Sequence, residues 1–518
     1  MSGEATELNA VMRVRRDKLA ALDAEGIVPY AYAYARTHGT QEALAAFEAL
    51  EAEARVGAGA DPAAPPPAEA EGPAVRVAGR VVSWRGQGKT AFAHLADAGG
   101  RLQCYFRQDV VGDAAFARLK SLVDVGDLVG VEGPCFRTRA GEITVRAERF
   151  ELLAKSLRPL PLGKEQVVDG AIVRHSGFAD PEQRYRQRYA DLAVHPEVRR
   201  TFVARTRMVS GIRGFLDGLG YLEVETPVLQ PLYGGATARP FATHHNALDM
   251  PLFLRIADEL YLKRLVVGGF ERVYEIGHDF RNEGIDRTHN PEITMLEFYE
   301  AYADYTTMMD RVEALVADAA RAVRAVLGPA AVPDVAGPFP RVEWVGSLNQ
   351  AFGGDLLALA DHDLRNAAAR VGVERVAGLS RPKLLDEMFQ ALVERHIVRP
   401  TFVVDYPVEL SPLAKPKRGN PTLTERFELF AQGRELANAF SELNDPIDQR
   451  RRFEAQARLN AAGDEEAGPV DEDYLRALEY GMPPTGGVGI GIDRLFMYLA
   501  GITHIRDAIL FPLMRAES

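Results

Sequence analysis

The segment 273–299 places charged side chains between two stretches in which apolar residues alternate. Alternation with a period of two is typical of strands, and the polar residues 282–290 between the stretches indicate a loop. We therefore expect an antiparallel hairpin with Arg281 and Glu283 at its mouth. A mouth of this kind can hold a polyanion, because guanidinium groups bind anionic oxygens in pairs. The alternative is a hairpin tip that is simply solvated.

Three glutamates, Glu428, Glu435 and Glu442, recur every seven residues within the segment 426–445. In a helix this spacing forms a charged stripe on a solvated face. The alternative is two strands joined by a turn at Gly433, because the neighbouring phenylalanines and leucines also favour strands. Two strands would bring Glu428 and Glu435 close together, and paired carboxylates bind Mg²⁺ through oxygen.

Glycines alternate with aliphatic residues in the segment 486–495. This pattern predicts a strand whose bare backbone another group can approach, followed by a helix that Arg494 opens; a strand used only for close packing is the alternative. The chain contains neither G-x-x-x-x-G-K-[ST] nor G-x-G-x-x-G after a strand. A nucleoside triphosphate would therefore be held by arginines and by carboxylate-bound magnesium.

The elements that must position these groups predict an α+β protein. Residues 74–155 contain five strand-like runs, the last over 142–153, with a helical stretch over 114–122 after the third. This order is typical of an OB-fold barrel, whose open face binds oligonucleotides; a small barrel without a nucleic-acid partner is the alternative. Residues 198–219 predict an amphipathic helix that ends at Gly220. The residues beyond it lack regular βαβ spacing, which predicts an antiparallel sheet flanked by helices.

A chain of 518 residues is too long for one core and should form two or three domains. We assign them by composition as a helical extension, a Pro/Ala-rich flexible linker, the OB-fold domain, an interdomain segment and the domain with the antiparallel sheet: 1–56, 57–73, 74–155, 156–190 and 191–518.

The bulk composition limits the compartment and the partners. No apolar run approaches the roughly 20 residues that span a bilayer, and the N-terminus lacks the pattern of a signal peptide. Cys104 and Cys135 predict neither a disulfide framework nor a zinc site. We expect a cytoplasmic protein. The net charge of −12 still allows nucleic-acid binding through a local basic patch.

Three motifs resemble those of class II aminoacyl-tRNA synthetases. They are G-Y-L-E-V-E-T-P at 220–227, F-R-N-E at 280–283 and G-I-G-I-D-R at 489–494. The flanking residues 234–248 and 259–273, together with F-S-E-L-N-D at 440–445, are similar to the bacterial lysyl-tRNA synthetases of subclass IIb. The resemblance runs from about residue 14 to residue 512 and is interrupted by the linker.

The resemblance implies a fold and a reaction. It implies an OB-fold anticodon-binding domain joined to a class II catalytic domain. It also implies that lysine reacts with ATP to form lysyl-adenylate and is then transferred to the 3′ end of tRNA(Lys) by a homodimer. Arg281 and Arg494 would be catalytic. Mg²⁺ bound with ATP would be held by Glu428 and Glu435.

The resemblance also implies three groups of binding residues. The residues for ATP are Arg281, Glu283, His289, Asn290, Ile293 and Arg494. Those for lysine are Gly235, Glu259, Arg281, Glu297, Tyr299, Asn438, Phe440 and Glu442, with Glu297, Tyr299 and Glu442 around the ε-ammonium. Those for the anticodon are Phe92, Gln103 and Glu142, although Phe92 taken alone also suits a core position.

Four residues depart from the family pattern. Asp258 stands where a proline is usual and is expected to loosen the turn before Glu259. Ile293 replaces a phenylalanine that faces adenine, which removes ring stacking. Ala437 and Ala439 replace glycines and are each expected to add a methyl group near the amino-acid pocket.

Two other functions remain open on the residues alone. One is a lysine ligase that modifies a translation elongation factor, and the barrel argues against it. The other is a catalytically inactive paralogue that acts as a tRNA-binding or protein-binding regulator. The intact Arg281, Arg494, Glu428 and Glu435 argue against that second alternative.

Overall fold

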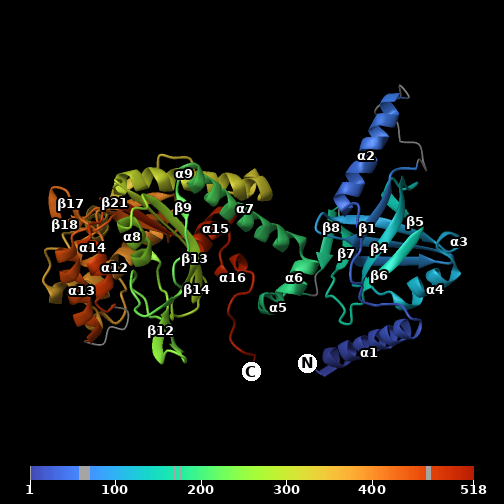
Figure 1. Ribbon diagram of the computed structural model, residues 1–518, viewed down its shortest axis with the longest axis horizontal. Coiled ribbons are helices and arrows are strands. Elements are labelled where there is room, and N and C mark those ends of the chain that lie inside the picture. Colours follow the sequence, from blue (N-terminus) through green and yellow to red (C-terminus); the bar gives the residue numbers. More distant parts are fainter. Residues whose placement is uncertain (1, 58–70, 169–170, 176–177, 462–467, 518) are drawn as a thin grey trace. The chain divides into compact units, whose positions relative to one another are not determined.

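The computed structural model describes residues 2–57, 71–168, 171–175, 178–461 and 468–517. The chain forms two compact units (Figure 1). The smaller comprises Met1–Arg184 and Tyr189–Val194, and the larger comprises Tyr185–Arg188 and His195–Ser518. Most of the linker predicted over 57–73 lies outside the described residues, because the description stops at 57 and resumes at 71.

The smaller unit contains a closed barrel, which confirms the predicted OB-fold. Its strands are β1 (Ala74–Gln87), β2 (Thr90–Ala96), β3 (Arg101–Arg107), β4 (Leu128–Arg137), β5 (Ile143–Ala147) and β6 (Arg149–Ala154). The order is β1-β2-β3-β5-β4-β6, and β1 also pairs with β4, so five strands close on themselves. The run predicted over 142–153 is two strands, since the chain leaves β5 before Glu148 and returns as β6 to pair with β4.

Helices cover the barrel and help to fill its interior. Leu22 and Phe47, from helices before the barrel, are buried in the same apolar cluster as alternate barrel residues such as Val77 and Leu95. Cys104 and Cys135 are also buried there as free thiols, and burial raises the pKa of Cys104. The remaining elements of this part of the chain are α1 (Ser2–Ala24), α2 (Thr40–Gly57), α3 (Gln108–Val111), α4 (Asp113–Leu122), β7 (Lys164–Val168), β8 (Ala171–His175), α5 (Pro181–Arg186) and α6 (Arg188–Val194).

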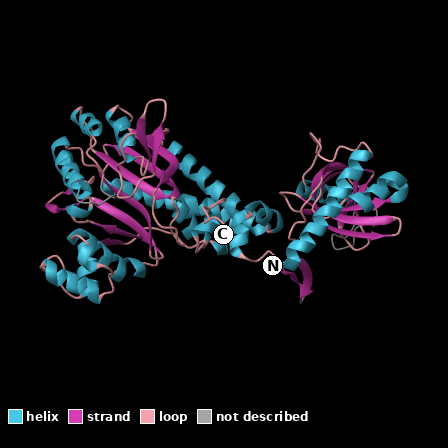
Figure 2. Cartoon of the chain, turned by 90° about the horizontal axis from the view of Figure 1, so that it is seen from below, coloured by secondary structure: helices cyan, strands magenta, loops and turns pink. Residues whose placement is uncertain are grey.

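The larger unit is built on an eight-stranded sheet in the order β15-β16-β19-β20-β21-β14-β13-β9. All its neighbours are antiparallel except the outer pairs β13–β9 and β15–β16. Figure 2 shows helices on both sides of this sheet, which confirms the predicted architecture. The strands are β9 (Leu222–Glu223), β13 (Arg272–Phe280), β14 (Glu292–Ala301), β15 (Arg341–Glu343), β16 (Thr401–Val404), β19 (Arg426–Ala431), β20 (Arg434–Ser441) and β21 (Thr485–Gly491).

One face of the sheet packs on α7 (Pro196–Gly218), α9 (Tyr305–Leu327) and α15 (Ile492–Ala500) (Figure 1). The apolar core between them includes Met208 from α7, Val312 from α9 and Phe298 from β14, all fully buried. Burying one such side chain stabilises the fold by about 1.5–3 kcal/mol. The Asp304 side chain accepts hydrogen bonds from the amides of Thr306 and Thr307 and so caps the start of α9.

The opposite face of the sheet is only partly covered. Leu262 from α8 (Glu259–Val267) and Leu475 from α14 (Glu472–Glu479) pack together with Tyr299 from β14. The other elements of this unit are β10 (Leu229–Gln230), β11 (Ala242–His245), β12 (Met250–Leu254), α10 (Trp344–Phe352), α11 (Asp361–Arg370), α12 (Arg381–Leu392), β17 (Pro416–Lys417), β18 (Asn420–Thr424), α13 (Pro446–Ala461) and α16 (Ile505–Ala508). Short 3₁₀ turns are η1 (Pro329–Ala331), η2 (Val376–Gly378), η3 (Glu394–His396) and η4 (Val408–Leu410).

The three segments singled out for their chemistry fold as strands. Residues 273–299 form the β13–β14 hairpin, paired from Arg272–Glu300 to Phe280–Glu292. Residues 426–441 form β19 and β20, so the helical interpretation is wrong. Gln432 (φ 51°) and Gly433 (φ 65°) make the turn between these strands. The helix after β21 begins at Ile492, two residues before Arg494.

Candidate active site

A cavity of about 480 Å³ lies on the sheet face opposite α7 and α9. It is lined by every residue that the sequence predicts for ATP, magnesium or lysine. They are Gly235, Glu259, Arg281, Glu283, His289, Asn290, Ile293, Glu297, Tyr299, Glu428, Glu435, Asn438, Phe440, Glu442 and Arg494. Residues from distant parts of the chain meet here because the strands β19, β20, β21, β14 and β13 are neighbours in the sheet and contribute side chains to the same face of it.

Strand alternation decides which side chains reach the cavity. On β14, Glu297 lines the cavity, whereas its neighbours Leu296 and Phe298 are buried in the core against α7 and α9. Successive side chains of a strand point to opposite faces, so a polar and an apolar set can interleave.

The same alternation corrects one prediction. Asn438 and Phe440 line the cavity, but Ala437 and Ala439 belong to the apolar core on the opposite face of β20. The expectation that their methyl groups crowd the amino-acid pocket is therefore wrong.

Glycines of β21 form part of the cavity lining. A Cβ atom at Gly487 would collide with the side chains of Glu442 and Tyr299. At Gly489 it would make only ordinary contacts, 3.7 Å from Met295 and 3.8 Å from Glu297, so Gly487 is the position that requires glycine. The bare backbone therefore leaves room for the acidic side chains that face it.

One end of the cavity carries cationic groups. Arg494 Nη1 lies 3.3 Å from Glu435 Oε2, and Arg494 Nη2 lies 3.1 Å from His289 Nε2. His289 is in turn paired with Asp286 through Nδ1 at 2.8 Å. Arg281 Nε is buried and has no hydrogen-bond partner among the described residues. A buried guanidinium donor without a partner is costly, so this arrangement favours an anion in the cavity.

The Glu428 side chain lies in an acidic environment beside the cationic end. Tyr406 donates a hydrogen bond to Glu428 Oε2 at 2.8 Å, and Arg426 pairs with Oε1. Burial and repulsion from Glu435 raise the pKa of Glu428 to about 7, against the lowering effect of Arg426. Burial and repulsion from Glu428 and Glu435 also raise the pKa of Glu394, which the sequence did not predict, to about 7. Mutually repelling carboxylates of this kind are the oxygen donors that Mg²⁺ prefers.

The other end of the cavity carries three buried carboxylates, those of Glu259, Glu297 and Glu442. Tyr299 donates a hydrogen bond to Glu297 Oε2 at 2.9 Å. Burial, with repulsion from Glu259, raises the pKa of Glu297 to about 8. Buried carboxylates require cationic partners, so this end favours ammonium groups.

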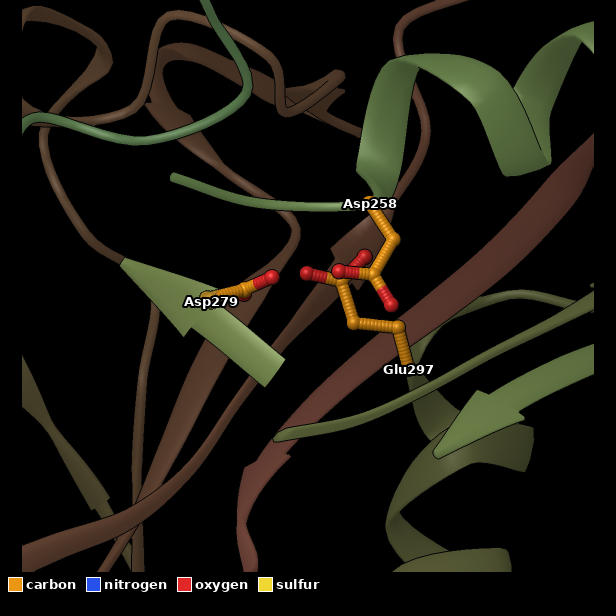
Figure 3. Close-up of side chains that lie close together, drawn as sticks. All are labelled: Asp258, Asp279 and Glu297. Carbon is orange, nitrogen blue, oxygen red and sulfur yellow. The ribbon is translucent and has the colours of Figure 1, made fainter. Parts of the chain in front are cut away.

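Glu297 also belongs to a cluster of three carboxylates with Asp258 and Asp279 (Figure 3). Each of Asp258, Asp279 and Glu297 contributes one carboxylate oxygen, and these three oxygens lie within 4.8 Å of one another. Arg255 approaches the cluster with its Nε 3.2 Å from Asp279 Oδ1. Burial raises the pKa of both Asp258 and Asp279, so the two aspartates hold a proton more tightly than free carboxyl groups. Asp258, the departure from the expected proline, is thus a fully buried member of this cluster.

Replacing Asp279 by asparagine is expected to stabilise the protein at pH 8. A carboxyl whose pKa is raised on folding binds protons more tightly in the native state. Its contribution to the free energy of unfolding therefore falls as the pH rises above the pKa that the carboxyl has in the unfolded chain. Asparagine keeps a hydrogen-bonding group and removes the ionisation. Urea unfolding should show a gain of about 1–3 kcal/mol at pH 8 that shrinks towards pH 5. Asp310→Asn, at an exposed site, is the control. A loss of stability at pH 8, or an equal gain at both pH values, would contradict this account.

Sequence reasoning missed several residues of the site. Arg426 holds both Glu428 and, through Nε at 3.0 Å, the Asn438 amide oxygen. Asp493 accepts a hydrogen bond from the Thr294 amide at 2.8 Å and pairs with Arg205 at 2.7 Å, which ties α15 to β14 and α7. The position of Asp493 within the G-I-D-R motif could have indicated this role from the sequence. Lys263, one helical turn after Glu259, is the third such residue.

The predicted anticodon residues lie together on one surface of the barrel. The Phe92 and Tyr105 rings stack with centroids 4.5 Å apart. Gln103 Nε2 donates to Glu142 Oε2 at 2.6 Å, and His94 Nε2 lies 2.8 Å from Glu142 Oε1. Phe92 is half-buried, whereas Gln103 is buried and already paired. His94 and Tyr105 were not predicted.

Comparison with known protein families gives a separate match for each of the two structural units. Residues 180–515 match the family described as tRNA synthetases class II (D, K and N), and residues 75–153 match the OB-fold nucleic acid binding domain. The chain is 51% identical over 516 residues to the lysine–tRNA ligase of Moorella thermoacetica, with 98% of each chain covered. It is 47% identical over 516 residues to the lysine–tRNA ligase of Bacillus subtilis, again with 98% of each chain covered.

An antiparallel sheet whose polar face carries the F-R-N-E and G-I-D-R residues in one cavity, preceded by an OB-fold barrel, defines a class II tRNA synthetase. The match over residues 180–515 places the chain in that class. Within the class, the chain belongs to the lysine–tRNA ligases, because its similarity to them extends over nearly the whole length of both chains.

Proposed function

We propose that this chain activates lysine with ATP and transfers it to the 3′ end of tRNA(Lys). In the first step an oxygen of the lysine carboxylate attacks the α-phosphorus of ATP and pyrophosphate leaves. In the second step a ribose hydroxyl of the terminal adenosine attacks the carbonyl carbon of lysyl-adenylate, and AMP leaves. The observation that supports this proposal is one cavity with cationic groups at one end and three buried carboxylates at the other.

Arg281 and Arg494 are the catalytic residues of this proposal. The attack joins two anions, so the barrier falls when fixed cations hold both groups in line. Arg281 bridges the lysine carboxylate and the α-phosphate with its planar fork, which suits its buried Nε without a partner in the described structure. Arg494, positioned by Glu435 and His289, holds the γ-phosphate.

The adenosine part of ATP lies against the hairpin loop and the start of β14. Glu283, His289 and Asn290 supply polar contacts, and Ile293 packs against adenine without ring stacking. All four residues line the cavity. The buried Asn290 donates through Nδ2 to the Glu292 carbonyl at 2.6 Å, so its side chain is already oriented.

Mg²⁺ bound with ATP is held by Glu428 and Glu435 in this proposal. The raised pKa of Glu428 beside Glu435 supports it, because a cation would relieve the repulsion between these carboxylates. When bound, the ion neutralises charge on the phosphate oxygens. Tyr406 and Arg426 orient Glu428, and Arg494 orients Glu435.

Glu435→Gln should raise the Mg²⁺ concentration that gives half-maximal ATP–pyrophosphate exchange by about tenfold or more. The amide keeps the shape of the side chain but removes the charge that binds the cation. The measurement is exchange rate against free Mg²⁺ at saturating lysine. Exposed Glu454→Gln is the control. An unchanged Mg²⁺ requirement would count against Glu435 as a ligand.

The carboxylate end selects lysine. Glu297, Tyr299 and Glu442 surround the ε-ammonium, while Gly235 and Glu259 hold the α-ammonium. Asn438 binds the carboxylate together with Arg281, and Phe440 packs along the aliphatic chain. A Cβ at Gly235 would lie 3.1 Å from Ala257 Cβ and 3.3 Å from Glu259 Cβ, so glycine keeps Glu259 from being displaced.

The barrel binds the anticodon through Phe92, Gln103 and Glu142. Phe92→Ala should raise KM for tRNA(Lys) by about 10- to 100-fold, because base stacking contributes about 1–3 kcal/mol per base. Lysine-dependent ATP–pyrophosphate exchange, which needs no tRNA, should stay unchanged. Val110→Ala, an exposed apolar position of the same unit, is the control. An unaltered tRNA KM would remove Phe92 from the proposed interface.

The proposal extends to assembly and compartment. The chain acts as a cytoplasmic homodimer that associates near the segment 220–227. Large apolar side chains are exposed close to that segment, at Val203, Leu222, Val228, Leu229 and Leu232, which supports an interface there. In the described part of the chain, every helix is too short or too polar to span a bilayer. Light scattering at micromolar concentration tests the dimer.

We further propose the domain functions that follow from the composition boundaries. Residues 74–155 bind the anticodon, residues 191–518 perform both reaction steps, and residues 1–56, 57–73 and 156–190 serve as extension, linker and interdomain segment. Aminoacylation of total tRNA with each of the twenty amino acids in turn tests the whole function. Charging of tRNA(Lys) with lysine is the expected result. If the protein showed no charging and no lysine-dependent exchange, only a binding or regulatory role would remain.

A further inference from the structure

Lys263 joins two carboxylates of the amino-acid end of the cavity. It lies one turn after Glu259 in α8, and its Nζ forms ion pairs with both Glu259 Oε1 and Glu442 Oε2. These two glutamates come from separate elements, α8 and the segment after β20, and both line the cavity. The Lys263 side chain is fully buried and lies behind them.

The surroundings of Lys263 keep its ammonium charged. Nζ lies 5.3 Å from the centre of the Phe440 ring, and Tyr474 of α14 and Glu297 of β14 also interact with it electrostatically. Burial lowers the pKa of Lys263, but Glu259 and Glu442 outweigh this effect and raise it overall. A buried ammonium of this kind remains a permanent positive charge between the two glutamates.

The charges at this end of the cavity can be counted. When all three are ionised, Glu259, Glu297 and Glu442 supply three carboxylates and Lys263 supplies one ammonium, which leaves two negative charges. A lysine substrate carries two ammonium groups, and its own carboxylate is assigned to Arg281 and Asn438. Nearby Arg426 is already paired with Glu428, and Arg255 with Glu275 and Asp279. Asp258 and Asp279 also lie close to Glu297, but burial raises the pKa of both, and they contact Arg255 rather than Lys263, so they are counted with Arg255 and not with the pocket.

We propose that Lys263 is a positioning and specificity residue that orients Glu259 and Glu442 and sets the charge of the pocket to the value that a diammonium amino acid neutralises. This inference rests on the proposed lysine-binding roles of these two glutamates. Burial raises the pKa of both Glu259 and Glu442, and the Lys263 ammonium is the strongest influence that lowers it. Without Lys263, the two glutamates would face each other without a buried counter-ion. One of them would then hold a proton at neutral pH, and lysine would have to displace that proton in order to bind.

The variant Lys263→Met tests the proposal, because methionine has a similar length and no charge. The KM for lysine at pH 7 is expected to rise about 30- to 300-fold, while the KM for ATP changes less than about threefold. The rise should become smaller towards pH 9, as the displaced carboxyl ionises. Arg264→Met, on the same helix but paired with Asp471 and Asp473 outside the group of three carboxylates, should leave the lysine KM unchanged.

Proton release on lysine binding gives a readout that a merely structural role would not alter. Calorimetry in two buffers of different ionisation enthalpy should show that Lys263→Met releases about one proton more than the unaltered protein when lysine binds at pH 7. Lys263→Arg, which keeps the charge, should release as many protons as the unaltered protein. Should Lys263→Met fail to fold, the same comparison is made with Lys263→Gln, and equal proton release by Lys263→Gln and the unaltered protein would overturn the proposal.

Glu442→Gln separates this inference from the assignment on which it rests. If Glu442→Gln raises the lysine KM but Lys263→Met does not, the role of Lys263 is wrong and the lysine site stands. If neither variant changes the lysine KM, the proposed lysine site itself is wrong. An equal effect of Lys263→Met on the lysine and ATP KM values would also overturn the proposal.

Discussion

Replacing Arg281 by lysine is expected to reduce lysine-dependent ATP–pyrophosphate exchange by about 10²- to 10³-fold. This is the size of the effect when one preorganised donor to a developing charge is lost. Lysine keeps the positive charge but cannot span two anions with parallel donors, as the guanidinium fork can. Because the bridge from carboxylate to α-phosphate is needed mainly in the transition state, kcat should fall more than either KM rises.

Arg287→Lys is the matched control for this prediction. Arg287 lies on the same loop, is exposed and does not line the cavity. Pre-steady-state quench measurements of adenylate formation would locate the loss in the chemical step. Exchange at the unaltered rate in Arg281→Lys would show that the charge alone is sufficient and that the proposed bridge is wrong.

Glu442→Gln is expected to raise the KM for lysine by about 30- to 1000-fold and to leave the KM for ATP nearly unchanged. The Glu442 side chain is almost completely buried, and glutamine preserves its shape. Loss of the carboxylate leaves the ε-ammonium and Lys263 with one anionic partner fewer, which costs about 2–4 kcal/mol. The variant should also discriminate less between lysine and uncharged amino acids of similar length.

Steady-state exchange at varied lysine and varied ATP measures the two KM values separately. Glu479→Gln, at an exposed position of α14, serves as the control. Equal increases in both KM values would indicate general damage to the cavity. They would remove Glu442 from the lysine site.

Much of the site could be predicted because its residues lie in short, strongly patterned segments. Period-two alternation identified the β13–β14 hairpin, and the Gly433 turn favoured two strands over a helix. The OB-fold and the class II architecture are confirmed, and the resemblance to lysyl-tRNA synthetases agrees with the family comparisons. The residue roles at the site stay predictions until the variants above are measured.

Other predictions failed because closeness in sequence was taken for closeness in space. Ala437 and Ala439 flank Asn438, yet strand alternation places them in the core on the opposite face. The strand that follows α7 covers only Leu222–Glu223, because only those residues pair with β13. Neither result could be obtained without knowing which neighbour each strand meets.

The sequence by itself determined the two folds, the strands that carry the site and the residue types on their polar face. These follow from local periodicity and from motifs whose residues are close together in the chain. Only the tertiary structure decided the partners of the buried charges, such as Lys263 with Glu442 and Asp258 with Asp279. The physical reason is that such contacts depend on how α8 packs against the sheet and on the register of each strand with its neighbours. A buried charge is stable only when that packing brings its counter-ion or shared proton within reach.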